Sequence, residues 1–124
     1  MELHRAGEDY LKAILLLQKK NGTVRSLDIA EMLHVSKLSV SAAVKLLREG
    51  GFLIMDEEKR ITLTGAGREA AEQIYEKHTI LKEFLIAMGV DPDTAEKDAC
   101  EMEHLVSRET LEQMKSFHGK EISA

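Results

Sequence analysis

The feature that most constrains this chain is a pair of short helical stretches placed close together near its amino end. Ser26 stands where a helix over residues 27–33 needs an N-terminal cap, and Ser36 does the same for residues 37–49. Serine favours such positions because its side-chain oxygen accepts a hydrogen bond from a backbone N–H group of the first turn. Two short helices separated by about three residues form a helix-turn-helix pattern.

Two short apolar stretches follow this pair of helices directly. Phe52–Met55 and Arg60–Leu63 are rich in β-branched and apolar side chains, and the polar residues Asp56–Lys59 separate them. This pattern predicts a β-hairpin. A helix-turn-helix followed by a hairpin predicts a winged helix-turn-helix, so we expect a fold class that is mainly α with a small β-hairpin.

The rest of the chain has the apolar spacing of amphipathic helices, with no internal repeat and no low-complexity linker. The further predicted helices cover residues 8–20, 64–88, 92–106 and 107–119. We therefore expect two regions, the winged helix-turn-helix over residues 1–71 and a helical region over residues 72–124.

The composition is that of a globular protein, since 44% of the 124 residues are hydrophobic and 31% are charged. No apolar run approaches the roughly 20 residues that a membrane span needs, and the amino end lacks the apolar stretch of a signal peptide. We therefore expect a cytoplasmic protein without a membrane partner. The net charge of −5 divides into about +1 over residues 1–71 and −6 over residues 72–124. The acidic region suits a cation, and the near-neutral region can still present a basic face.

One helical face in the acidic region carries chemistry. In the penultimate predicted helix, Glu96, Cys100, Glu103 and His104 form a stripe beside the apolar stripe that should face the core. The last three bring a thiolate, a carboxylate and an imidazole together at spacings of three and four residues, a donor set suited to a first-row divalent metal. His78 lies in the middle of another apolar stripe and needs a polar partner, which supports a metal site.

The same residues also have simpler interpretations. A single cysteine on a helix flank is commonly a small buried hydrophobe, and a Glu–His pair is commonly part of a solvated face. An inward histidine is more often satisfied by hydrogen bonds in the core than by a metal. Cys100 and His104 could form the nucleophile and base of an enzyme, but the sequence has no Gly-rich phosphate loop and no oxyanion element, so we expect no enzyme.

The second helix of the helix-turn-helix is the part that reads DNA in such folds. Its N-terminal part carries no Arg, Asn or Gln, the side chains suited to bidentate base contacts. Thymine-methyl contacts from Leu38 or Ala42, together with groove shape, should therefore provide the sequence preference. Hydroxyls and cations around them can hold phosphates. The candidate DNA-contacting residues are Arg25, Ser36, Lys37, Leu38, Ser39, Ser41, Ala42, Lys45, Lys59 and Arg60.

Several stretches give the sequence a specific resemblance. They are Glu8–Leu11, Asp28–Glu31, Leu63–Gly67, Lys77–His78 and Asp98–His104. Through them, and over almost its whole length, the chain resembles the diphtheria-toxin-repressor family of metal-dependent regulators. The resemblance implies that a metal joins the start of the first helix to the carboxy-terminal region. Carried over by position, the metal ligands are Asp9, Cys100, Glu103 and His104, with His78 at a neighbouring second site.

The resemblance implies a mixed metal preference. Cys100 stands where iron-type members have Cys and manganese-type members have Glu, whereas Asp9 matches the manganese-type pattern. A thiolate favours softer ions. We therefore expect Fe(II) in preference to Mn(II), with Zn(II), Co(II) or Ni(II) also binding in vitro.

Two lysines depart from the family pattern. Lys12 follows the expected first-helix ligand by one turn, and Lys82 follows His78 by one turn. Both stand where acidic ligands of the second site are expected, and an ammonium cannot coordinate a metal. Either these lysines extend into solvent, or one of them pairs with Glu96 or Glu103 and partly replaces the charge of a second metal.

Together these features predict a metal-dependent transcriptional regulator, most simply a repressor, that controls metal homeostasis. Loaded with Fe(II) or Mn(II), it would bind a double-stranded DNA operator as a homodimer, because one module covers only a short half-site. Residues 1–71 would bind DNA, and residues 72–124 would bind the metal and dimerise through the apolar stripes of residues 81–88 and 105–117. No organic substrate is expected. The alternative is a winged-helix regulator that responds to oxidation of Cys100 or to a small organic ligand, with no metal requirement.

Overall fold

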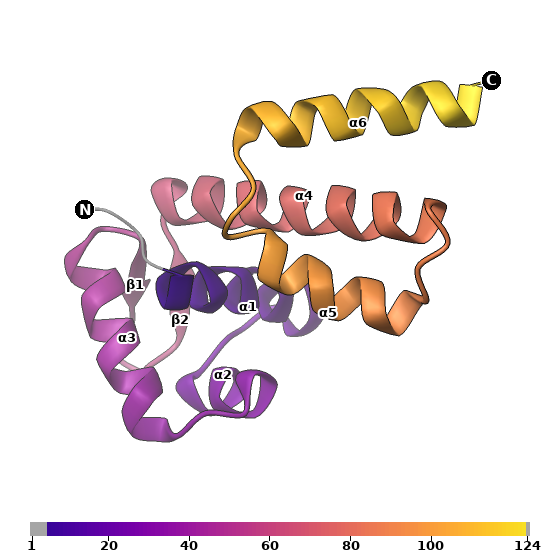
Figure 1. Ribbon diagram of the computed structural model, residues 1–124. Helices are drawn as coiled ribbons and strands as arrows, with labels where there is room; N and C mark the ends of the chain where they lie inside the picture. The colour runs from indigo at the N-terminus through magenta and orange to yellow at the C-terminus, as the bar shows by residue number, and fades with distance from the viewer. Residues whose placement is uncertain (1–4, 124) are drawn as a thin grey trace. The chain divides into compact units, whose positions relative to one another are not determined.

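A computed structural model describes residues 5–123 of the chain, and their side chains as far as residue 118. The elements in order are α1 (Arg5–Asn21), α2 (Ser26–Leu33), α3 (Lys37–Glu49), β1 (Leu53–Met55), β2 (Ile61–Leu63), α4 (Gly65–Ala87), α5 (Pro92–Met102) and α6 (Arg108–Ser123). Figure 1 shows this order along the ribbon. The expected fold class, mainly α with one small β-hairpin, is confirmed. The chain divides into two compact units, residues 1–72 and 73–124.

The first unit is a winged helix-turn-helix built around one apolar core. Helix α1 is amphipathic, and its apolar residues recur every three or four positions, so one face is buried. The inward faces of α2 and α3 and the alternate residues of the hairpin complete the core. Its buried members include Leu11, Ile14, Leu15, Ile29, Val40, Val44, Leu47, Leu53, Ile61 and Leu63.

The helix-turn-helix is capped differently at its two helices. Ser36 caps α3 as predicted, because its hydroxyl oxygen accepts the N–H of Ser39 at 3.1 Å. The prediction that Ser26 caps the preceding helix is wrong, since Ser26 is the first residue of α2 and Arg25 is the cap. The Asp28 carboxylate accepts the backbone N–H of Arg25 at 2.9 Å, and this contact starts the helix one residue earlier.

The hairpin forms the wing, with β1 and β2 antiparallel and Leu53 opposite Leu63. Each strand is one residue shorter than predicted. The N–H of Phe52, before β1, donates to Leu47 at the end of α3, and the N–H of Arg60, before β2, donates to the Asp56 carboxylate. The N–H of Ile61 donates to Val24 at 2.8 Å, which ties β2 to the segment between α1 and α2. The wing is therefore attached to the helices on both sides.

The second unit consists of α5, α6 and the larger part of α4, with α4 lying between the other two helices (Figure 1). Leu81, Ala99 and Leu111, one from each helix, form its small buried core. Asp91 caps α5 as predicted, because its carboxylate accepts the N–H groups of Asp93 and Thr94. Within the described residues, no helix has both the length and the apolar character to cross a membrane.

Two predicted helix ends in this unit are wrong. Helix α5 ends at Met102 rather than near Val106, so His104 lies in a turn and not on the helix. Helix α6 continues to Ser123, past the predicted end at Gly119. A glycine within a helix costs only about 1 kcal/mol, so Gly119 alone does not end α6.

Candidate metal centre

The centre of the possible metal site is Glu103, a carboxylate that is only 1% exposed. It follows the last residue of α5, keeps a helical backbone and donates its N–H to Ala99 at 3.0 Å. Ala95 and Ala99, on the same helix, are fully buried. The short alanine side chains therefore let α5 approach its neighbours closely, and the carboxylate enters an interior where a negative charge requires partners.

His78 of α4 supplies one of these partners and lies between two carboxylates. Its Nδ1 atom is 3.0 Å from Oε2 of Glu103, and its Nε2 atom is 3.1 Å from the carboxylate of Glu96. A ring protonated on both nitrogens can donate to both carboxylates, whereas a neutral ring can donate to only one. The polar partner expected for an inward histidine is therefore present.

Cys100 and His104 extend this group of donors. The Cys100 Sγ atom lies 3.8 Å from Nδ1 of His78 and 4.0 Å from Oε1 of Glu96. The Nε2 atom of His104 lies 3.6 Å from Oε1 of Glu103, and the His104 side chain is only 3% exposed. His78, Glu96 and Cys100 each offer a donor atom, and these atoms lie within 4.8 Å of one another.

The donor set fits a first-row divalent metal. It combines a thiol sulfur, imidazole nitrogens and carboxylate oxygens, and softer donors of this kind select transition metals over Mg²⁺ or Ca²⁺. Glu103 is buried and Cys100 is half-buried, which limits competition from water. The chemistry of these side chains is therefore compatible with iron, manganese or zinc.

Lys82 of α4 pairs with the outer carboxylate of the group. Its Nζ atom lies 2.9 Å from Oε2 of Glu96, and this bond together with the negative charge of Glu96 raises the pKa of Lys82. Burial alone would raise the pKa of Glu96, but hydrogen bonds from Lys82 and His78 lower it below its ordinary value. Of the two pairings considered for Lys82, the one with Glu96 is present.

The remaining predicted metal residues belong to the first unit. Asp9 and Lys12 lie on α1, three residues apart on one side of the helix. Their part in a metal centre stays a prediction.

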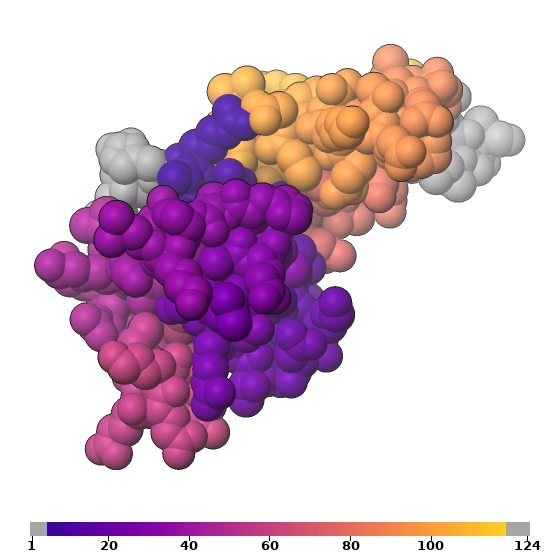
Figure 2. All heavy atoms as spheres, turned by 90° about the horizontal axis from the view of Figure 1, so that it is seen from below, coloured from indigo at the N-terminus to yellow at the C-terminus, as the bar shows by residue number. Residues whose placement is uncertain are grey.

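The candidate DNA-contacting residues lie on the surface of the first unit. Helix α3 buries Val40, Val44 and Leu47 and exposes its other face, as expected. Figure 2 faces this side, with α2 and α3 in purple and magenta and the hairpin in pink beside them. Leu38 is 81% exposed, which is unusual for a leucine and leaves its methyl groups available for contact. All the other candidates are also exposed: Arg25, Ser36, Lys37, Ser39, Ser41, Ala42, Lys45, Lys59 and Arg60.

Two cations need to be reassessed as phosphate contacts. Arg60 is already paired, since its Nε atom lies 2.7 Å from Asp56 and its guanidinium lies 3.4 Å from Glu58. Arg48 was not a candidate, yet it is exposed on α3 three residues after Lys45. The helical spacing from Ser41 through Lys45 to Arg48 was the signal in the sequence that would have identified it.

A winged helix-turn-helix, followed by a helical unit with a buried group of sulfur, nitrogen and oxygen donors, defines a class: DNA-binding regulators with a metal-binding part. The family model described as "Iron dependent repressor, N-terminal DNA binding domain" matches residues 2–61. A second model, "Iron dependent repressor, metal binding and dimerisation domain", matches residues 64–121.

Known proteins show the same relationship. A transcriptional regulator from Methanocaldococcus jannaschii is 36% identical and covers 91% of this chain and 92% of its own length. The transcriptional regulator MntR of Escherichia coli O157:H7 is also 36% identical, over 96% of this chain and 78% of its own. The solved structure of the manganese regulator SloR has a TM-score of 0.82 and 30% identity, and it matches 96% of this chain. The chain spans about half of that structure, 55% of its length.

The chain therefore belongs to the diphtheria-toxin-repressor family and is a metal-dependent transcriptional regulator. This assignment sets aside the alternative regulator with no metal requirement. The curated relatives are named as transcriptional regulators.

Proposed function

We propose that this protein is a repressor that binds operator DNA as a homodimer when it is loaded with a divalent metal, and that it controls metal homeostasis in the cytoplasm, where its operator DNA would lie. Residues 1–71 read the DNA, and residues 72–124 hold the metal and form the dimer. The observation that carries the proposal is the buried carboxylate of Glu103, surrounded by His78, His104 and the nearby Cys100. Burying a carboxylate this far from solvent costs folding free energy unless a positively charged partner lies beside it.

Asp9, Cys100, Glu103 and His104 are the proposed ligands. The bound cation supplies two positive charges to a set of ligands that carries several negative ones, because metal binding requires deprotonated side chains. Glu103 and His104 are adjacent in the chain and share one backbone turn, so they move together. Asp9 lies on α1, so its participation would connect the DNA-reading unit to the second unit.

The chemistry of Cys100 supports Fe(II) as the preferred ion over Mn(II). A thiolate binds softer ions better, while Asp9 would add a harder oxygen that accepts manganese. Relatives in this family include a manganese regulator, SloR, and a structure titled ScaR with bound Zn²⁺. Several divalent metals are therefore expected to bind in vitro, among them Zn(II), Co(II) and Ni(II). Their relative affinities for the site would decide which metal activates DNA binding.

The proposed mechanism is a shift in conformational population. In the metal-free protein, Asp9 and Glu103 are not ligated to one divalent ion, so the DNA-reading unit would sample many positions. Their ligation to one ion restricts those positions. DNA binding then costs less conformational entropy, and affinity for the operator rises.

On DNA, the exposed face of α3 would enter the major groove. Leu38 and Ala42 would contact thymine methyl groups, and Lys37, Lys45 and Arg48 would contact phosphates. The wing residue Lys59 has a positive φ of 66°, which places it in the turn of the hairpin loop. Few direct base contacts are available, so groove shape and deformability supply part of the preference.

The test is operator binding with and without metal. A duplex selected from a random library by the metal-loaded protein is titrated by fluorescence anisotropy in Mn(II), in Fe(II) under anaerobic conditions, and in EDTA. We expect chelation to weaken binding at least tenfold, in line with ordinary coupling energies of 1–3 kcal/mol. Glu103→Gln should bind equally weakly in all three conditions, because it removes the charge that the ion compensates.

Glu112→Gln is the matched control, since Glu112 is exposed on α6 and loses the same charge. It should keep the full metal response. Equal affinity of the wild-type protein in EDTA and in metal would overturn the proposed function.

A further inference from the structure

The second unit already contains a cation of its own within the donor group. Lys82 extends from α4 to α5, and its ammonium lies 2.9 Å from Oε2 of Glu96. The same carboxylate faces Nε2 of His78 at 3.1 Å. Glu96 therefore has two positively polarised partners before any metal is added.

A divalent ion at this outer position would compete directly with Lys82. The donor atoms of His78, Glu96 and Cys100 lie within 4.8 Å of one another, close enough to form a cation site by distance alone. An ion bound there would need the Glu96 carboxylate and would lie only a few ångströms from the ammonium. Unit charges about 4 Å apart near a protein surface interact strongly, so this repulsion opposes a metal at the outer position.

We propose that the Lys82 ammonium permanently replaces a second metal ion, so that each chain binds a single metal, at the inner donors Glu103 and His104 and at Cys100, which also neighbours the outer donors His78 and Glu96. The inference rests on the proposed function for the inner position. It assigns the outer donors a different role. Lys82 pairs with Glu96, Glu96 contacts His78, and Nδ1 of His78 lies 3.0 Å from the Glu103 carboxylate. This row of four side chains positions the Glu103 carboxylate, which would ligate the metal.

The row also explains why Lys82 lies where it does. His78 and Lys82 are four residues apart on α4, one helical turn, and therefore face the same side. Glu96 and Cys100 have the same spacing on α5. One turn of each helix thus contributes two groups, and of these only the Lys82 ammonium cannot donate an electron pair to a metal.

The number of bound ions tests this proposal. Metal-free, full-length protein is titrated calorimetrically with Mn(II) alone, and the bound metal is also counted by elemental analysis after gel filtration. The wild-type protein should bind a single Mn(II) per chain. Lys82→Glu removes the ammonium and adds a carboxylate beside the outer donors His78 and Glu96, so this variant should bind two Mn(II) ions. The second Mn(II) should bind at least about 100-fold more tightly than any second Mn(II) in the wild type.

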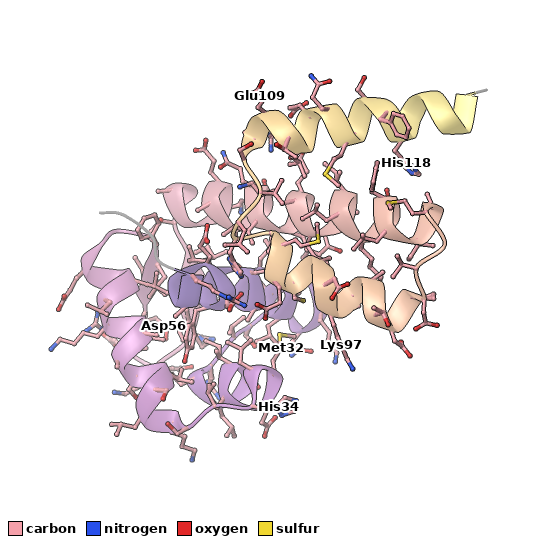
Figure 3. All side chains as sticks on the ribbon, in the orientation of Figure 1. Met32, His34, Asp56, Lys97, Glu109 and His118 are labelled. Carbon is pink, nitrogen blue, oxygen red and sulfur yellow. The ribbon has the colours of Figure 1, made fainter. Side chains whose placement is uncertain are left out.

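The matched control is Lys97→Glu, which makes the same charge change on the same helix as Glu96. Lys97 is exposed and projects from α5 on the side away from α4 (Figure 3). This variant should still bind a single Mn(II), which separates a local effect of Lys82 from a general effect of net charge. Circular dichroism of each metal-free variant checks that it is folded.

Lys82→Met provides a second variant in case Lys82→Glu does not fold without metal. It removes the ammonium without adding a ligand, so a second, weaker Mn(II) should appear. Two ions of comparable affinity in the wild type, or a single ion in both Lys82 variants, would overturn the inference while leaving the proposed function intact. A wild-type protein that binds no Mn(II) at all would instead refute the proposed function.

Discussion

Gly67 shows how a single residue fixes the connection between the wing and the long helix. A Cβ atom at this position would overlap the backbone carbonyl oxygen of Phe52, which cannot move without displacing the start of β1. The hydroxyl of Thr64 donates to the carbonyl of Gly51 at 2.6 Å and accepts the N–H of Gly67 at 3.1 Å. The absence of a side chain therefore permits this close approach.

Gly67→Ala should lower the free energy of unfolding by about 3 kcal/mol, the upper end of the usual cost of overpacking. Gly65→Ala is the control, because a Cβ atom there meets nothing within 4 Å. It should leave stability unchanged or raise it slightly. Urea unfolding followed by circular dichroism measures both, and equal midpoints for the two variants would contradict the role assigned to Gly67.

Among the elements, the wing has a loop that is organised by one carboxylate. Asp56 accepts the backbone N–H groups of Glu58 and Arg60, each at 2.9 Å, and pairs with the Arg60 guanidinium. The backbone N–H of Arg60, its guanidinium and the N–H of Glu58 lower the pKa of Asp56 below its ordinary value. The loop conformation therefore depends on the charged form of this side chain.

The wing should consequently lose stability in acid. The folded pKa of Asp56 is lower than the unfolded one, so its contribution is complete above about pH 4 and disappears as the pH falls through the folded value. The melting temperature of the wild type should exceed that of Asp56→Asn at pH 7, and the difference should shrink by pH 3. Glu57→Gln, at an exposed neighbouring position, should show no such pattern. A difference that stays constant with pH would exclude the charge as the cause.

At the scale of the whole molecule, the proposed homodimer requires an apolar surface that the monomer leaves open. In the second unit, Phe117 is 56% exposed and its ring lies 6.2 Å from that of Phe84, centre to centre. Met88 is also exposed, and together with Ala87 and His118 these residues line a hollow at the end of α4 and α6. Figure 3 shows His118 at this end of α6. Apart from His118, these residues lie on the two stripes, residues 81–88 and 105–117, that the sequence predicts as the dimer surface.

Phe117→Glu should weaken the dimer, because it places a charge where the partner subunit would bury an aromatic ring. The dimer dissociation constant should rise at least tenfold, as measured by sedimentation velocity over a range of protein concentrations. Ser116→Glu adds the same charge at an exposed adjacent position and should leave the dimer intact. An unchanged dimer in Phe117→Glu would move the interface elsewhere.

Much of the fold could be read from the sequence because its signals are local. The Ser36 and Asp91 caps, the turn between α2 and α3, and the alternation in the hairpin each depend on neighbouring residues. The start of α2 is also set locally, because the Asp28 carboxylate accepts the N–H of Arg25 three residues earlier, although Ser26 was predicted as the cap. The end of α5 at Met102 was not visible in the apolar spacing, which continues to Val106.

The candidate metal site also has one part that the sequence predicts and another part that depends on the tertiary structure. The sequence by itself singled out Cys100, Glu103 and His104 as candidate ligands by their spacing of three and four residues, although His104 lies in the turn after α5. Only the tertiary structure decided that His78 lies between Glu96 and Glu103, and that Lys82 binds Glu96. These residues lie on two helices separated by a turn, and the packing of α4 against α5 sets which of their side chains meet. No periodicity within either helix contains that information.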